Sequence, residues 1–354
     1  MAETDDAPGP DQVLGAPHPR EQTSLFGHAE AEADFLRAYR AGQLHHAWLV
    51  GGPAGIGKAT FAYRAARFLL THPDPGTTAA AVGLGVPRDH AIARQVAALS
   101  HPDLAVVRRG PRKDGKGFSA EIAVADVRRA LDLFGSTAGG YRICIVDAAD
   151  DLNASSANAL LKAVEEPPPR SVIFIIAHAP ARVLPTLRSR CRRLLLRPLG
   201  TNDVALAVRS LGEPWAGAAD AVVSEAATLS GGSVGRALSL LDADRIALIH
   251  RVQGLLERLP ELELDTLYRL AEDVSRRDST PEFEAMRETL ADWLADRIRA
   301  QAGEGARRLA PLVEAWEKNA GAAREAEALN LDRRPVVISL FCDLADAMRQ
   351  PRAV

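Results

Sequence analysis

The stretch Gly52-Pro53-Ala54-Gly55-Ile56-Gly57-Lys58 constrains the fold most, because its G-x-x-x-x-G-K spacing is typical of a phosphate-binding loop. Residues 46–50 before it form a short apolar run that predicts a buried strand, and residues 61–70 after it have apolar side chains at helical spacing. In this order, backbone N–H groups and a helix N-terminus face phosphate oxygens. Lys58 would add a charge for the β- and γ-phosphates. The segment predicts a nucleotide site, with ATP as the expected ligand.

One position departs from the pattern where a metal ion is normally held. The residue after the lysine is Ala59, whereas such loops have Ser or Thr, whose hydroxyl binds Mg²⁺. Thr60 follows, but one residue along a helix is about 100° of rotation, so its hydroxyl should point elsewhere. We expect residues 52–60 to hold a nucleotide beside a damaged Mg²⁺ site, and we predict no metal bound by the protein itself.

A second buried strand ends on Asp147. An acidic residue at the carboxyl edge of a parallel strand, next to a phosphate loop, is placed for a second Mg²⁺ contact; the alternative is an aspartate that caps the next loop. ATPases of this type usually continue with a glutamate that orients the attacking water, and here the residue is Ala148. Asp150 and Asp151 lie too far along the chain to replace it without a special loop. With Ala59, the substitution argues against a working ATPase.

The pattern of the remaining chain predicts an α/β domain followed by helices. Residues 141–146 and 172–177 are apolar throughout, as strands of a parallel sheet covered on both faces must be. Helical spacing lies between them at 154–166, and a run of three prolines from Pro167 ends that helix. Beyond residue 246 the pattern is helical, and its apolar stripes indicate core or subunit interface.

Composition narrows the class of protein further. The 354 residues suffice for two or three domains, and a formal net charge of -3 fits an ordinary protein in solution. The three cysteines are far apart, which favours a reducing compartment and argues against a zinc site built from cysteines. No secretory signal or apolar run long enough to span a bilayer is present, so we expect a cytoplasmic protein. Residues 1–18 lack basic side chains and are rich in Ala, Pro, Gly and acid, which predicts a mobile tail.

Three stretches resemble one family. Residues 45–50, leading into the phosphate loop, are similar to the first strand of bacterial clamp-loader subunits, and residues 157–168 to their most distinctive helix. The stretch Leu187-Arg188-Ser189-Arg190-Cys191 is similar to their Ser-Arg-Cys element. The order and spacing of the three agree over about residues 20–245. The chain therefore resembles the AAA+ clamp-loader family of bacterial DNA polymerase III.

The resemblance implies roles for particular residues. Arg190 would be an arginine finger that stabilises charge on the transferred phosphoryl group in a neighbouring subunit. The alternative is an arginine in the surface basic cluster of residues 182–197. Arg236 matches the sensor-2 arginine that reaches the γ-phosphate, unless it lies on an exposed helix face. His178 follows the third strand, where the family has a polar sensor, and we expect it to be buried and hydrogen-bonded.

The resemblance also implies a domain order. We expect a flexible tail at 1–19, an AAA+ nucleotide-binding domain at 20–199, a three-helix lid at 200–245 and a helical collar at 246–354 that holds a hetero-oligomeric ring together. Relatives often have a four-cysteine zinc module, but residues 71–140 contain no cysteine, so we predict no zinc.

The function implied is that of a stator. It would act with motor and delta subunits to load the sliding clamp onto primed DNA, within the DNA-directed DNA polymerase III holoenzyme, a nucleotidyltransferase complex. We expect no autonomous ATPase, no membrane partner, and DNA contact only to phosphates. One alternative is an ATP-hydrolysing AAA+ motor in which Thr60 and Asp150 or Asp151 cover for the lost groups. Another is a stand-alone P-loop kinase or transferase, which the helical second half disfavours.

Overall fold

The computed structural model describes residues 12–13, 15–112, 117–135, 139–276, 279–301, 306–328 and 331–349. The chain divides into two compact units, Met1–Leu241 and Asp242–Val354. Within the described ranges, no helix combines the length and the apolar character needed to cross a membrane.

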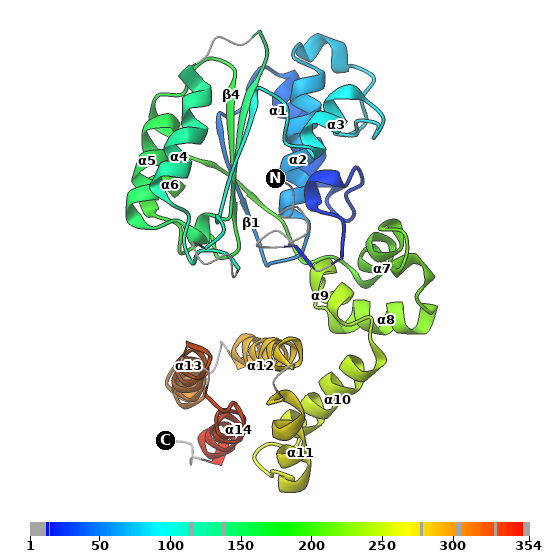
Figure 1. The fold of residues 1–354 in the computed structure, drawn as a ribbon, viewed down its shortest axis with the longest axis vertical. Helices are drawn as coiled ribbons and strands as arrows, with labels where there is room; N and C mark the ends of the chain where they lie inside the picture. Colours follow the sequence, from blue (N-terminus) through cyan, green and yellow to red (C-terminus); the bar gives the residue numbers. More distant parts are fainter. Residues whose placement is uncertain are drawn as a thin grey trace. The chain divides into compact units, whose positions relative to one another are not determined.

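The first unit is built on a five-stranded sheet in which every neighbouring pair of strands is parallel. Its order is β2-β3-β4-β1-β5, with β1 between β4 and β5 (Figure 1). The strands are β1 Ala47–Gly51, β2 Leu104–Arg108, β3 Arg142–Asp147, β4 Ser171–Ala177 and β5 Arg192–Leu195. All residues of β1 and β4 are buried, which confirms the parallel sheet covered on both faces.

Side chains of each central strand alternate between two cores. In β1, Trp48 and Val50 belong to one hydrophobic cluster and Ala47 and Leu49 to the other, because successive residues of a strand face opposite sides. One face is covered by α1, α2 and α3, and the other by α4, α5 and α6 (Figure 1). These helices are α1 Ala29–Arg40, α2 Lys58–Thr71, α3 Ala91–Ala97, α4 Val124–Leu131, α5 Ala154–Glu165 and α6 Pro185–Arg188.

The edge strand β5 was not expected from the sequence, where its arginines indicated only a basic surface. Arg192 and Arg193 are exposed, and the guanidinium carbon of Arg192 lies 4.8 Å from the centre of the Trp48 ring. Charged side chains are common on edge strands because they hinder pairing with another chain. The sequence of β5 therefore lacks the apolar run by which the central strands were predicted.

Two buried arginines of α2 bind residues that precede β1 in the chain. Arg64 makes a bidentate ion pair with Glu32, in which the Nε–Oε1 distance is 2.6 Å and the Nη2–Oε2 distance is 3.2 Å. Arg67 donates to the backbone carbonyls of Arg20 and Gln22. Burial and the neighbouring Arg64 lower the pKa of Arg67 to about 10, so it stays charged at neutral pH.

Three helices with a small apolar core of their own complete the first unit: α7 Thr201–Ser210, α8 Asp220–Leu229 and α9 Val234–Ser239. Val204, Val208 and Val223 are buried in that core. The helices lie where the sequence predicted them, and the domain boundaries at residues 199 and 245 stay predictions.

The second unit contains only helices in its described residues. They are α10 Ala243–Glu257, α11 Leu264–Val274, α12 Thr280–Gln301, α13 Ala306–Ala328 and α14 Arg334–Arg349. Of the predicted apolar stripes, Met286, Leu290, Leu294 and Leu312 are buried in one shared core. The periodic positions are therefore core residues of a helical bundle.

Part of the expected N-terminal tail is packed. Ala16 and His18 are both 7% exposed, and Gln12 donates from Nε2 to the carbonyl of Ala16 at 2.6 Å. Residues 1–11 and 14 lie outside the described ranges, so the prediction for them stays a prediction.

The buried pair of α1 and α2 should contribute strongly to stability. We expect Glu32→Ala to lower the free energy of unfolding by about 3–5 kcal/mol, because it leaves the buried Arg64 charge uncompensated. Urea denaturation measures this. Glu30→Ala, an exposed position of the same helix, should stay within about 0.5 kcal/mol of wild type. Equal effects of the two substitutions would contradict the assignment.

Candidate functional site

The loop after β1 has the backbone that a phosphate-binding loop requires. Gly52, Gly55 and Gly57 have φ of 143°, 73° and 99°, which L side chains rarely adopt. A Cβ on Gly52 would lie 2.5 Å from the carbonyl oxygen of Leu196, and one on Gly55 would lie 2.2 Å from Ser233 Oγ. These positions therefore accept glycine alone without rearrangement.

Contacts from α1, α9 and α2 hold this loop in place. The Nε2 atom of His28, at the N-terminus of α1, lies 2.7 Å from the carbonyl oxygen of Ile56 and donates to it. At the start of α9, the amide of Val234 donates to the carbonyl of Gly55 at 2.9 Å. Lys58 begins α2, is 3% exposed and donates from Nζ to the carbonyl of Pro53. The loop conformation is thus fixed by contacts from three separate segments.

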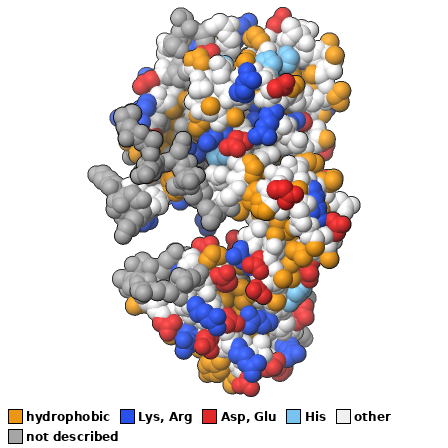
Figure 2. All heavy atoms as spheres, turned by 45° about the vertical axis from the view of Figure 1, so that its right-hand side comes forward, with side chains coloured by type: hydrophobic (Ala, Val, Ile, Leu, Met, Phe, Trp, Pro, Cys, Tyr) orange, Lys and Arg blue, Asp and Glu red, His pale blue; other side chains and the backbone are white. Residues whose placement is uncertain are grey.

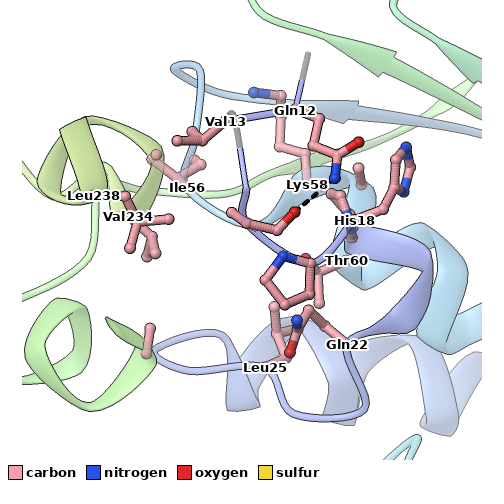
Figure 3. A pocket seen from close by; sticks show the side chains of 18 of the residues that line it. Gln12, Val13, His18, Gln22, Leu25, Ile56, Lys58, Thr60, Val234 and Leu238 are labelled. Carbon is pink, nitrogen blue, oxygen red and sulfur yellow. Dashed lines mark hydrogen bonds between the residues drawn. The ribbon is translucent and has the colours of Figure 1, made fainter. Parts of the chain in front are cut away.

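A cavity of about 180 Å³ lies against this loop, at the carboxyl edge of the sheet. Lys58 and Thr60 line it from α2, and Val234 and Leu238 line it from α9 (Figure 3). Its remaining described walls include the N-terminal segment, through Gln12, Val13, Ala16, Pro17, His18 and Pro19. Cavities at this edge of parallel sheets are the usual place for ligands.

Charged groups meet at one end of the cavity. Arg108 ends β2 and Asp147 ends β3, and the two residues are paired in the strand register. The Arg108 Nη1 atom lies 3.4 Å from His18 Nε2, and the His18 ring packs edge-on against Tyr63 with centroids 5.9 Å apart. Burial, with Arg20 and Arg108 nearby, lowers the pKa of His18 to about 3, so the ring is neutral at physiological pH. Burial raises the pKa of Tyr63, and the carboxylate of Asp147 adds to that shift.

The carboxylates proposed as substitutes for the missing catalytic base are engaged elsewhere. Asp150 accepts from the backbone amides of His178 at 2.6 Å and Ala179 at 2.8 Å, so it holds the end of β4. Asp151 forms an ion pair with Arg109 at 3.0 Å. Ala148 is fully buried and offers no polar group. Neither aspartate is placed as a base for an attacking water.

The cavity does not fit the Mg²⁺ site usual for such loops. Among its described lining residues, Asp147 is the one carboxylate, and Ala59 supplies no oxygen from its side chain. Across the described part of the chain, no three His, Cys, Asp or Glu side chains form a metal-binding group. Thr60 also lines the cavity. One carboxylate facing an arginine is a poor cradle for a divalent cation.

The structure places the two other residues predicted near the nucleotide, His178 and Arg236, differently with respect to the cavity. His178 lines the cavity and is half-buried. Arg236 lies on α9 together with Val234 and Gly235, which line the cavity, but it is not itself part of the described lining. Its backbone amide donates to Ser233 Oγ at the N-cap of α9. The sensor role of Arg236 stays a prediction.

Arg190 lies at the opposite edge of the sheet. It precedes β5 and shares a surface hollow with His45, His46 and Glu165, before the start of β1. Since β1 is five residues long, the two edges are about 16 Å apart at ~3.3 Å per residue. Its Nε atom is 2.9 Å from Glu165 Oε1, and its Nη1 donates to the carbonyl of Thr186 at 2.9 Å. Arg190 therefore does not reach the cavity of its own chain.

Hydrogen bonds of the neighbouring residues shape the turn around Arg190. Ser189 Oγ donates to the carbonyl of Thr186 at 3.1 Å, and Cys191 Sγ donates to that of Leu187 at 3.1 Å. Burial raises the pKa of the Cys191 thiol to about 12, so it stays protonated and able to donate. These groups satisfy carbonyls at the end of α6 and fix where the arginine emerges.

Three contributors to the cavity were missed by sequence reasoning: the N-terminal segment, Arg108 and His28. No local pattern identifies the first, because its composition is that of a tail. The position of Arg108 at the end of a strand beside Asp147 could have been anticipated, since carboxyl ends of parallel strands share an edge. His28 acts through a long-range contact with Ile56, which residue spacing does not encode.

Comparison with known proteins finds a matching family model and related sequences. A family model described as "DNA polymerase III, delta subunit" matches residues 27–200. The DNA polymerase III subunit delta' of Pseudomonas aeruginosa is 38% identical over 149 residues, which are 41% of each chain. The protein of the same name from Escherichia coli is 34% identical over 209 residues, 59% of this chain and 58% of that protein. The matches thus span less than two thirds of the relatives' own length.

Among solved structures, RuvB of Thermotoga maritima is similar over 93% of this chain and 92% of its own. The TM-score is 0.41 and the sequence identity 17%.

Replacing Gly52 should test the loop geometry. Gly52→Ala combines a positive φ with a clash against the Leu196 backbone, and we expect it to lower the free energy of unfolding by about 1–3 kcal/mol. Gly42→Ala is the matched control, because Gly42 has a φ of 66° with nothing within 4 Å of an added Cβ. Urea denaturation should show the smaller loss for the control; equal losses would mean that backbone conformation alone matters.

His18 should make stability depend on pH. Its folded pKa lies near 3 against an ordinary 6.5, so the unfolded chain binds the extra proton and stability is lost as pH falls below 6.5. We expect wild type to lose about 1–2 kcal/mol more than His18→Gln between pH 7 and pH 5. Burial also lowers the pKa of His46, so the difference between the two proteins, measured by urea denaturation, is the relevant quantity.

Proposed function

We propose that this chain is the stator subunit of the DNA polymerase III clamp loader, because a family model described as "DNA polymerase III, delta subunit" matches residues 27–200 and two delta' subunits are 38% and 34% identical over part of the chain. In this role it supports ATP-dependent loading of the sliding clamp onto primed DNA, together with motor and delta subunits. It supplies Arg190 as an arginine finger in trans and does not hydrolyse ATP itself. The protein acts in the cytoplasm as part of the polymerase holoenzyme.

The position of Arg190 carries the proposal. It lies at the edge of the sheet opposite its own phosphate loop, with 42% of its side chain exposed. An arginine there serves a phosphate group only if that group belongs to another molecule. Its planar guanidinium is permanently charged and matches phosphate oxygens, which suits the stabilisation of a transferred phosphoryl group.

The way Arg190 is held supports the same role. Contacts to Glu165 and Thr186 use Nε and Nη1 of the guanidinium. Both partners are themselves anchored, since Glu165 ends α5 and Thr186 lies in α6. A guanidinium held in advance loses less entropy when it meets a phosphate, and this adds to the charge stabilisation that an arginine finger provides.

The cavity of this chain supports binding without turnover. The loop and Lys58 can hold phosphates, whereas Ala59 and Ala148 lack the groups that hold the metal and orient water. Asp150 and Asp151 are used in structural contacts. ATP is the nucleotide that we propose for this cavity.

One observation favours a second candidate, an ATP-hydrolysing motor subunit. Thr60 lines the cavity, so a side chain that carries a hydroxyl is present beside the phosphate loop. This candidate still lacks a base at position 148. ATP hydrolysis by the isolated chain separates the two: absence supports the stator and turnover supports the motor.

Any DNA that this chain contacts within the clamp-loader ring should be bound through its phosphates. The face in Figure 2 shows Lys and Arg interspersed with Asp and Glu, not gathered in one field of positive charge. Interspersed charges do not make a surface that reads sequence by itself. We also propose that the helical second unit is the collar that binds other subunits. DNA contacts would then be made by the assembled complex.

Replacing Arg190 tests the proposal. In the reconstituted clamp loader with clamp and primed DNA, we expect Arg190→Ala to reduce hydrolysis at the site it serves by about 10³-fold, the range for lost arginine fingers. Total ATP turnover should fall clearly while gel filtration shows an intact assembly. Arg190→Lys should rescue little, because an ammonium lacks the planar fork.

Arg193→Ala is the matched control for this experiment. Arg193 is exposed in the same segment but does not line the hollow that holds Arg190. Its replacement should leave turnover unchanged. Unchanged turnover in Arg190→Ala with normal assembly would overturn the finger assignment.

A further inference from the structure

The cavity beside the phosphate loop has a positive excess without any metal. Lys58 and Arg108 line it, and among the described lining residues Asp147 is the one carboxylate. Lys58 is buried at the N-terminus of α2, where the helix dipole adds further positive potential. A ligand that suits this environment is an anion of more than one charge.

Arg108 lies beside Asp147, the carboxylate that the sequence predicts as a Mg²⁺ contact. It ends β2 beside Asp147 at the end of β3, in register, and neighbouring strands are about 4.8 Å apart. Its Nη1 atom contacts His18 across the cavity wall, which fixes the guanidinium at this end of the cavity. A fixed positive charge beside Asp147 opposes the binding of a divalent cation there and supplies the neutralising charge itself.

We propose that this cavity binds a nucleoside di- or triphosphate without a divalent cation, and that Arg108 takes the charge-neutralising place of Mg²⁺. The proposal rests on the nucleotide binding included in the proposed function and assigns a binding residue to it. The guanidinium donates to phosphate oxygens together with Lys58 and the loop amides. No bond is made or broken, so the bound nucleotide remains intact.

Apolar side chains that line the same cavity suit the rest of a nucleotide. Leu25, Leu211 and Leu238 line the same cavity. Apolar walls with a few polar groups at one end are typical of small-molecule sites. A nucleotide should therefore bind more tightly than inorganic pyrophosphate, which would use only the charged end.

Calorimetric titration of the full chain with ATP and with ADP tests this directly, in EDTA and in Mg²⁺. We expect the affinity in EDTA to be within about threefold of that in Mg²⁺, a difference below one conventional hydrogen bond. Affinity that appears only with Mg²⁺ would overturn the proposal. Absence of binding in both buffers would overturn it as well, together with nucleotide binding by this chain, but would leave the Arg190 role to the clamp-loader assay. Pyrophosphate binding as tightly as ATP would overturn the assignment to a nucleotide.

Variants of Arg108 test the residue itself. Arg108→Gln should weaken binding in EDTA by about tenfold or more, as expected when a charge-assisted hydrogen bond is lost. Arg108→Lys, which keeps the charge, should recover most of that loss. Arg94→Gln, an exposed position of α3 outside the cavity, removes the same charge and should bind as wild type. Wild-type affinity in Arg108→Gln, with an unchanged melting temperature, would overturn the role of Arg108.

Discussion

The hydrogen bonding of β1 between β4 and β5 is the constraint on which the rest of the structure depends. Both neighbours are parallel to it, so the carboxyl ends of all three strands meet at one edge and their amino ends at the other. The phosphate loop follows β1 at the first edge, and Arg190 precedes β5 at the second. Because all five residues of β1 are buried, it cannot slide by one residue without exchanging its two cores. The separation of the two candidate sites therefore follows directly from strand pairing.

The groups around the cavity show how a loop of this kind can persist without its catalytic partners. Ala148 is packed in the core, and Asp150 bonds to the backbone at the end of β4. These residues stabilise the carboxyl edge of the sheet, and none is held in an arrangement suited to activating water. The conformation of the loop depends instead on His28 and α9, whose contacts are made to backbone carbonyls. The conformation of the loop thus depends on contacts that involve neither Ala148 nor Asp150.

Much of the fold could be predicted, because its signals are local. Strong apolar runs and glycine spacing gave β1, β3, β4 and the loop within a residue or two. The strand β5 was missed because an exposed edge strand needs no apolar pattern, as Arg192 and Arg193 illustrate. The wall formed by residues 12, 13 and 16–19 was missed because it packs through long-range contacts that its own composition does not indicate. The expected direction of the Thr60 hydroxyl stays a prediction, although the residue lines the cavity.

The anchoring of the N-terminal segment by Arg67 has an implication for how this cavity can vary among related sequences. Arg67 binds the carbonyls of residues 20 and 22, which every amino acid provides. The side chains of residues 20 and 22 take no part in these hydrogen bonds, whereas His18 holds the wall through its contacts with Tyr63 and Arg108. One buried arginine on α2, the helix that also presents Lys58, secures a wall whose chemistry can diverge. A substitution at position 22, which lines the cavity, can thus change the chemistry of that wall while the backbone bond to Arg67 remains.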